Sequence, residues 1–247
     1  MTAWERFEKA PIVEALLDIQ VTFPSPVAPS RLESFHDAIR DRYPTKQNRT
    51  KWEGQIRVAE LEVQQAVKRA AEGFMFRSED SRRTVQVRQD GYTFNQLRPY
   101  DNWEALRDEA REHWERYRDV FRPEAVTHLG LRYINRIEIP VPFSDFREFV
   151  KTAPDIATGL SQGVRAFFMR LEIPDPTRGL IAIVTETIQP PTPDTKQLPL
   201  IFDIDVVRSA TFEPSSPAIW ETFEQMRDYK NEIFFNTMTE RAKEIFR

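Results

Sequence analysis

Hydrophobic and polar residues alternate along two well-separated segments of the chain. In residues 12–21 every second position from Val13 to Val21 is apolar, and in residues 129–139 the same holds from Leu129 to Ile139, apart from Asn135. A repeat of two is typical of a strand with one buried face. The pattern therefore predicts two half-buried strands.

Between these segments the pattern predicts two helices and several strands. Apolar positions at helical spacing predict a helix over 30–43, and the polar, basic stretch from Thr45 to Gly54 predicts a loop. Residues 55–71 fit a strand or a helix, and we favour a strand. Asp101 is expected to cap a long helix that ends near Pro123. Short strands, with a hairpin turn at Asp90-Gly91, are expected at 74–76, 85–87 and 92–94.

The second half of the chain repeats this order of elements. After the strand at 127–139 the sequence predicts a short helix from Asp145 to Val150 and a final long helix from Pro217 to Phe246. Three strands are expected between these helices, at 164–173, 180–188 and 200–207.

The repeated order predicts an internal duplication. Each half begins with a strand and ends with a long helix that starts at a Trp-Glu pair, Trp103-Glu104 or Trp220-Glu221. We therefore expect an α+β fold of two similar lobes, 1–124 and 125–247. Each lobe is expected to have a mainly antiparallel sheet with one short and one long helix.

Composition adds limits on the class of protein. The 247 residues are 40% hydrophobic and 30% charged, as in a globular fold, and the absence of cysteine excludes disulfides and thiol chemistry. No apolar run approaches the length of a membrane-spanning helix, so we expect a cytoplasmic protein with no membrane partner. The net charge is -4, yet residues 40–100 carry 13 Lys/Arg against 8 Asp/Glu.

Three short segments resemble a known family. They are Ala10–Leu16, Arg98–Tyr100 and Arg132–Ile137, which reads RYINRI. Together they resemble a sporadically distributed, uncharacterised bacterial family over nearly the whole chain. That family has no assigned activity, so the resemblance implies no catalytic residue. Its scattered distribution implies an accessory component of a defence or toxin-associated system.

Candidate ligand-binding residues lie on the predicted strands. Asn135 interrupts an apolar face, where a hydrogen-bonded core amide is the preferred interpretation and a ligand-binding amide the alternative. Arg132 and Arg136 share the opposite face and could hold phosphate oxygens or pair with acids. Asp203 and Asp205, with Glu186 on a neighbouring strand, could bind magnesium, although pairing with arginines is the preferred interpretation.

Other sites receive less support from the sequence. Nucleic-acid binding is a disfavoured alternative, whose candidate residues are Lys46, Arg49, Lys51, Trp52, Arg82 and Arg83. The three histidines have no metal-ligand spacing, and no phosphate-binding glycine loop or G-x-S-x-G motif occurs. We expect neither a metal nor a cofactor.

The final helix carries more apolar residues than one buried stripe needs. They predict an interface with a second copy of the chain, as a homodimer, or with another protein, and the candidate residues are Phe223, Phe234, Phe235, Met238 and Phe246. The sequence thus favours a non-enzymatic protein-interaction module. The alternatives are a phosphate- or nucleotide-handling protein that uses the Arg/Asp sheet face, and a nucleic-acid binder.

Overall fold

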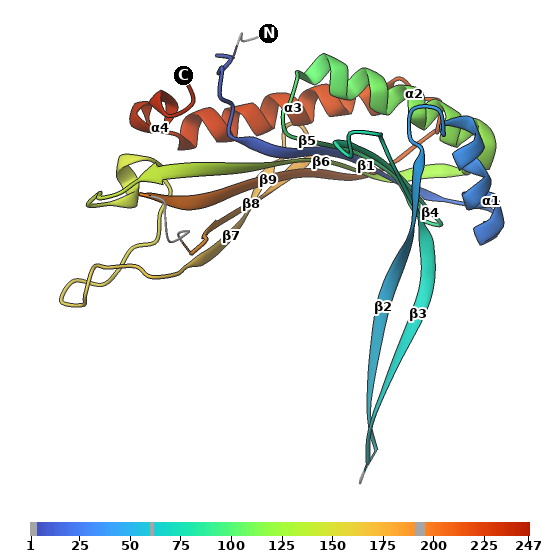
Figure 1. Cartoon of the computed structure of the whole chain (residues 1–247), viewed down its shortest axis with the longest axis horizontal. Helices are drawn as coiled ribbons and strands as arrows, with labels where there is room; N and C mark the ends of the chain where they lie inside the picture. Colours follow the sequence, from blue (N-terminus) through green and yellow to red (C-terminus); the bar gives the residue numbers. More distant parts are fainter. Residues whose placement is uncertain (1–3, 60–61, 191–195) are drawn as a thin grey trace.

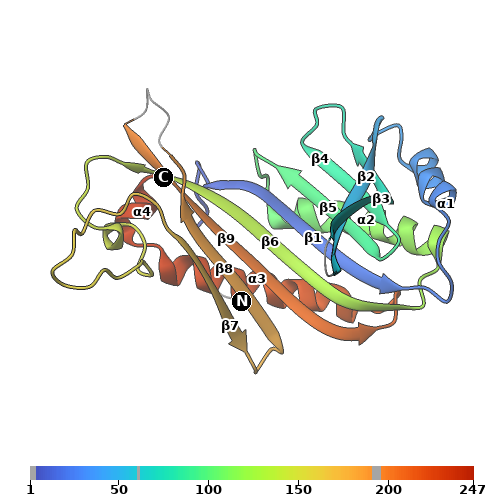
Figure 2. The same cartoon turned by 90° about the horizontal axis from the view of Figure 1, so that it is seen from below.

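Nine strands form a single antiparallel sheet in the computed structural model. The structure describes residues 4–59, 62–190 and 196–247, and for 50–59 and 62–72 it describes the backbone alone. The strand order is β2-β3-β4-β5-β1-β6-β9-β8-β7 (Figures 1 and 2). The bounds are β1 Ile12–Thr22, β2 Thr45–Ala59, β3 Glu62–Arg77, β4 Arg83–Arg88, β5 Gly91–Leu97, β6 Ala125–Pro140, β7 Phe168–Asp175, β8 Leu180–Ile188 and β9 Gln197–Phe212.

The helices cover one face of this sheet and leave the other open (Figure 1). The bounds are α1 Pro29–Ser34, α2 Trp103–Phe121, α3 Ala218–Thr237 and α4 Glu240–Glu244, with two 3-10 helices, η1 Phe35–Ala38 and η2 Phe146–Glu148. The predicted α+β class and the antiparallel pairing are confirmed. Among the described helices, none combines the length and apolar character needed to cross a membrane.

Strands β1 and β6 lie in the middle of the sheet and join its two halves. They pair antiparallel, with Leu17 opposite Leu131, so both predicted half-buried strands are confirmed. Strand β1 also pairs with β5, and β6 also pairs with β9. Because of these pairings the strands form one continuous sheet rather than a separate sheet for each half.

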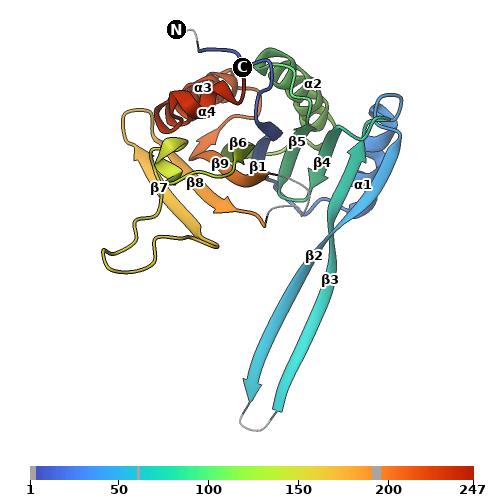
Figure 3. The same ribbon diagram turned by 60° about the vertical axis from the view of Figure 1, so that its left-hand side comes forward.

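A long hairpin, made of β2 and β3, extends away from the sheet (Figure 3). The predicted loop from Thr45 to Gly54 is wrong, because β2 pairs with β3 from Thr45 onward; the strand favoured for 55–71 is confirmed for the described residues. Strand β3 pairs with β4 only from Gly73 to Arg77. A side chain at Gly73 would approach the Val87 carbonyl oxygen to 2.0 Å, so this close crossing requires glycine.

The two predicted helices of the first half need correction at their ends. Asn102, rather than Asp101, caps α2, since its side chain accepts a hydrogen bond from the Ala105 amide at 2.8 Å. The predicted helix over 30–43 ends early and tightens into η1. The four apolar residues that predicted this helix are all buried: Leu32, Phe35, Ile39 and Tyr43.

Several boundaries in the second half also differ from the prediction; for example, the strand expected at 200–207 is the longer β9. The helix expected from Asp145 to Val150 is the single turn η2, and the strand expected at 164–173 is β7, which starts at Phe168. The long helix ends at Thr237 instead of Phe246. Met238 is extended and bridges to Val150, and the Thr239 side chain then caps α4.

Candidate functional site

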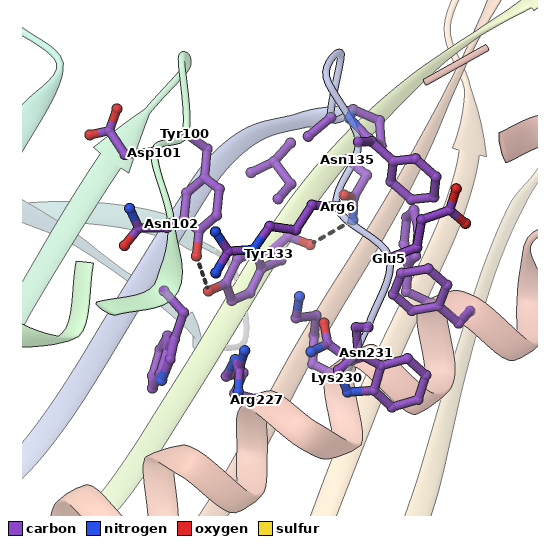
Figure 4. Close-up of a pocket in the computed structure, with 18 of the residues that line it drawn as sticks. Glu5, Arg6, Tyr100, Asp101, Asn102, Tyr133, Asn135, Arg227, Lys230 and Asn231 are labelled. Carbon is purple, nitrogen blue, oxygen red and sulfur yellow. Dashed lines mark hydrogen bonds between the residues drawn. The ribbon is translucent and has the colours of Figure 1, made fainter. Parts of the chain in front are cut away.

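A cavity of about 220 Å³, here called the Lys230 cavity, lies on the helix side of the sheet. Four parts of the chain line it: the N-terminal segment 4–12, residues 100–104 at the start of α2, the middle of β6, and the second half of α3 (Figure 4). Since β6 is a central strand, the cavity lies over the middle of the sheet.

Lys230 occupies a position of α3 that would ordinarily be apolar. Its neighbours on the same helical face, Met226 and Phe234, are buried, and Lys230 itself is only 9% exposed. Its Nζ atom lies 3.9 Å from the centroid of the Tyr133 ring and has no hydrogen-bond or ion-pair partner among the described residues. Burial, helped by the charge of Arg227, lowers the pKa of Lys230 to about 7. The group is therefore a buried amine without a counter-ion.

Tyr133 and Asn135 on β6 form the floor of the cavity (Figure 4). The hydroxyls of Tyr133 and Tyr100 lie 2.9 Å apart, within hydrogen-bond distance. Asn135 is 2% exposed, and its Nδ2 donates to the carbonyl oxygen of Phe202 at 2.9 Å and that of Tyr133 at 3.4 Å. The predicted hydrogen-bonded core amide is confirmed. The Asn135 Oδ1 atom accepts no hydrogen bond from a described residue and remains available as an acceptor.

Charged groups around the cavity are unequally paired. Each acid has a basic partner: Glu5 accepts from Arg247, Asp101 accepts from Arg83, and Glu104 lies 3.9 Å from Arg6. Arg227 has only the adjacent Asp228, at 3.8 Å, and Lys230 has no acid partner in the described chain. The cavity therefore has a surplus of positive charge.

The predicted Arg/Asp site lies on the open face, the face of the sheet opposite the helices. Arg132 holds Asp203 in a two-pronged ion pair, with Nε to Oδ1 at 2.9 Å and Nη2 to Oδ2 at 2.6 Å. Arg136 donates to Glu138 at 2.6 Å and to Gln189 at 3.1 Å. Both arginines thus have carboxylate partners, as the predicted alternative of pairing with acids requires. A phosphate could bind these arginines only by displacing the carboxylates of Asp203 and Glu138.

Asp205 lies near these groups on the open face, and burial raises its pKa to about 6. The expected third acid, Glu186, lies elsewhere. Glu186 is paired with Met169 on β7 and with Phe202 on β9, and paired residues point to the same face of a sheet. Phe202 is buried on the covered face, so Glu186 is there too, whereas Asp203 and Asp205 on β9 point to the open face. The disfavoured alternative, a magnesium site made by these three carboxylates, is therefore contradicted, because Glu186 lies on the opposite face from Asp203 and Asp205. No group of three or more metal-ligating side chains occurs among the residues that the structure describes.

Glu186 is itself unusual. It is 1% exposed, neither carboxylate oxygen has a hydrogen-bond partner in the described part of the chain, and burial raises its pKa to about 7. His113, with 0% exposure, is a second buried group without a hydrogen-bond partner among the described side chains, and the nearest acid, Glu109, lies 4.0 Å from its Nε2. Burial lowers its pKa to about 4, which keeps the ring neutral between Tyr43 and Phe94.

The nucleic-acid candidates whose side chains the structure describes do not form a free basic patch. Lys46 pairs with Glu33, Arg83 pairs with Asp101 and Glu109, and Arg82 lies 3.9 Å from Asp80. Arg49 donates a hydrogen bond to Gln86. The side chains of Lys51 and Trp52 lie outside the described residues.

The interface candidates on the last helix are mostly covered by the chain itself, contrary to the prediction that they face a partner. The N-terminal segment returns over the end of α3, where Trp4 stacks on Phe235 at 4.9 Å between ring centroids and Phe7 contacts both Phe234 and Phe246. Phe235 is half-buried, and the other four are buried: Phe223, Phe234, Met238 and Phe246.

Sequence reasoning missed Lys230, although the sequence carries a signal for it. Positions 219, 223, 226, 230 and 234 follow the helical spacing of the buried stripe of α3, and a lysine stands at one of them. The contributions of Tyr100 and the N-terminal segment have no such local signal, because they depend on contacts between distant parts of the chain.

A scan against protein-family models gives no match to this chain, and a search of the curated proteins gives none either.

Proposed function

We propose that the protein is a non-enzymatic interaction module that associates with a second copy of itself through the β2–β3 hairpin. The observation that carries this proposal is that the outer part of the hairpin is paired only within itself. Strand β3 reaches β4 only from Gly73 onward, whereas its pairing with β2 continues to Glu62 opposite Ala59. An isolated two-stranded hairpin is marginally stable in water, so a partner surface would stabilise it.

The position of β2 favours a second copy as that partner. Strand β2 is at the edge of the sheet, so one side of its backbone has no neighbouring strand in the described chain. Two identical edges can pair antiparallel about a two-fold axis and satisfy these amide and carbonyl groups in both copies. An interface of this kind is self-complementary.

The sequence of the hairpin is compatible with self-association. In the sequence of β2 the even positions Trp52, Ile56 and Val58 are apolar and the odd positions Lys51, Glu53 and Arg57 are charged, an alternation typical of a strand with one mostly apolar face. Residues 50–72 carry four Lys/Arg and four Asp/Glu, so two hairpins would not repel by net charge. The same balance disfavours nucleic acid as the partner, because its phosphates attract a basic surface.

The experiment compares the oligomeric state of the intact chain with that of a variant whose hairpin is shortened. Residues 50–72 are replaced by Asn-Gly, which joins Arg49 to its partner Gly73 with a two-residue turn. Light scattering coupled to size-exclusion chromatography at micromolar concentration should give a dimer for the intact chain and a monomer for the shortened one. The matched control exchanges the paired residues Glu53 and Lys68, which keeps length and charge, and it should remain a dimer. A monomeric intact chain, or a shortened chain that still dimerises, would overturn the proposal.

We place this module, as a proposal, among the accessory components of bacterial defence or toxin-associated systems, the setting that the family resemblance implies. Phosphate or nucleotide handling by the open face has less support, since Arg132 and Arg136 already have acidic partners. A nucleic-acid function also has less support, because most of the described basic candidates are paired with acids and the hairpin carries as many acidic as basic residues.

We also propose that residues 1–124 and 125–247 are two similar lobes that arose by duplication. Each half starts with a central strand, β1 or β6, and its last strand pairs back to that strand before the long helix begins. The link from the last helix to β1 would then correspond to the link from α2 to β6. The Lys9 amide donates to the Phe246 carbonyl at 2.8 Å, which brings the two ends together.

A circular permutant tests this correspondence. A short Gly/Ser linker joins Arg247 to Met1, and new ends are opened between Pro123 and Glu124, so that the second half comes first. If the two links are equivalent, the permutant should fold with the circular dichroism spectrum and cooperative urea unfolding of the parent. An insoluble or non-cooperative permutant would count against two exchangeable lobes.

A further inference from the structure

We propose that the Lys230 cavity is a binding site for a small aromatic carboxylate. The site does not involve the β2–β3 hairpin, so this proposal is independent of the one above. It rests on unpaired polar groups inside the cavity, on the surplus of positive charge there, and on the size and aromatic walls of the space.

Two side chains on α3 bring unpaired polar groups to the cavity. Lys230 and Asn231 both line it, they are 9% and 8% exposed, and neither side chain has a hydrogen-bond partner among the described residues. Figure 4 shows Lys230 extending from α3 toward Tyr133. Buried polar groups are nearly always paired, so an ammonium and an amide left without partners side by side indicate a missing ligand. A carboxylate has two acceptor oxygens, one for each group.

The charges around the site favour an anion over a neutral or cationic ligand. The acids Glu5, Asp101 and Glu104 have the basic partners described above, whereas Arg227 and Lys230 have no acid of the sheet or of the N-terminal segment beside them. An anion would supply the missing negative charge in a place of low dielectric, where its attraction to the ammonium is stronger than in water.

The walls and volume of the cavity limit the rest of the ligand. Trp4 and Tyr100 line it, and the Tyr100 ring meets that of Tyr133 edge to face, with centroids 5.6 Å apart. Aromatic walls of this kind favour a flat ring as their partner. A cavity of roughly 150 Å³ holds benzene, so about 220 Å³ suits a single ring with a short carboxylate arm.

Such a ligand would change the protonation of Lys230. Without ligand, burial and Arg227 hold the pKa of this amine at about 7. A carboxylate beside it favours the ammonium and raises that pKa, so binding takes up a proton. Uptake should approach one proton at pH 8, where the free amine is mostly neutral, and fall toward zero at pH 6. The other charged side chains that line the site are Arg6, Arg227, Glu5, Asp101 and Glu104. The hydrogen bond from Arg247 lowers the pKa of Glu5, and burial raises the pKa values of Tyr100 and Tyr133, so both hydroxyls stay protonated.

The experiment is calorimetric titration of the full chain with phenylacetate, and with phenylacetamide as a probe of the same shape without charge. Phenylacetate has about ten non-hydrogen atoms, for which a dissociation constant of about 1 mM or tighter is expected. Phenylacetamide should bind at least tenfold more weakly. Repeating the titration in buffers of different ionisation enthalpy measures the proton uptake at pH 6 and pH 8.

The test variant is Lys230→Met, and the control is Lys151→Met at an exposed lysine. Lys230→Met should bind phenylacetate at least tenfold more weakly and lose the proton uptake, while Lys151→Met should match the parent. Urea unfolding of each variant establishes that it is folded, and the comparison of the two probes on the parent does not depend on any variant. No saturable binding of phenylacetate at 10 mM, equal affinity for the two probes, or an unchanged affinity in folded Lys230→Met would overturn the proposal.

Discussion

Replacing Glu186 by glutamine should stabilise the protein above neutral pH and leave it nearly unchanged in acid. The side chain of Glu186 is 1% exposed on the covered face of the sheet, and its oxygens have no hydrogen-bond partner in the described part of the chain. Glutamine has the same shape and cannot ionise. The variant therefore isolates the cost of a buried, unpaired carboxylate.

The magnitude follows from the pKa of Glu186, which burial raises from 4.5 to about 7. The native state therefore holds the proton more tightly than the unfolded chain between these values. Its stability falls as pH rises through this window and then stays constant above it. Since each pKa unit corresponds to about 1.4 kcal/mol, the gain from Glu186→Gln should be under about 1 kcal/mol at pH 5 and about 3 kcal/mol at pH 8.

Urea unfolding followed by tryptophan fluorescence at pH 5, 6, 7 and 8 measures this dependence. The control is Glu79→Gln, at an exposed acid of the turn before β4, which should not reproduce the gain at pH 8 because it removes no buried carboxylate. A gain for Glu186→Gln that is the same at every pH, or absent at pH 8, would refute the reasoning. Either result would mean that the carboxyl is solvated or has a basic partner in solution.

Two further substitutions test the middle of the sheet and the amine above it. Asn135→Ala should lower the free energy of unfolding by roughly 1–3 kcal/mol, because the Phe202 carbonyl loses its side-chain donor; an unchanged urea midpoint at pH 7 would contradict this. In the parent, the pKa of Lys230 is lowered from 10.5 to about 7, so the native state binds fewer protons than the unfolded state between these pH values. The stability of the parent therefore rises with pH over this range, whereas Lys230→Met has no such dependence. The advantage of the variant should be largest at pH 6, up to about 5 kcal/mol, and should shrink by pH 10; an advantage independent of pH would argue against a buried ammonium.

Local patterns predicted the centre of the sheet because its strands obey them. The alternation in 12–21 and 129–139 gives β1 and β6, and the single exception, Asn135, identified a buried amide that the contacts confirm. Alternation also carried unused information about Glu186. Its neighbours at every second position of β8, Val184 and Ile188, are apolar, which assigns Glu186 to the covered face.

Contacts between distant segments account for the parts that could not be predicted. The stretch from Thr45 to Gly54 has few apolar residues, and it is a strand because β3 pairs with it residue by residue. The apolar surplus on the last helix suggested a partner protein, whereas Trp4 and Phe7 from the other end of the chain cover it. The sequence of α3 contains no signal that the N-terminal segment packs against this helix.

Glu186 and Lys230, both buried ionisable groups on the covered side of the sheet, differ in one physical respect. Both oxygens of Glu186 are fully enclosed, so its carboxyl can avoid the cost of burial only by taking up a proton. Lys230 borders a cavity, so its amine can either lose a proton or receive an anionic partner. A ligand that binds the native state alone stabilises it by RT ln(1 + L/Kd), where L is the free ligand concentration, so the effect grows with that concentration. Phenylacetate should therefore raise the urea midpoint of the parent and of Glu186→Gln alike, and at the same concentration it should raise the midpoint of Lys230→Met much less.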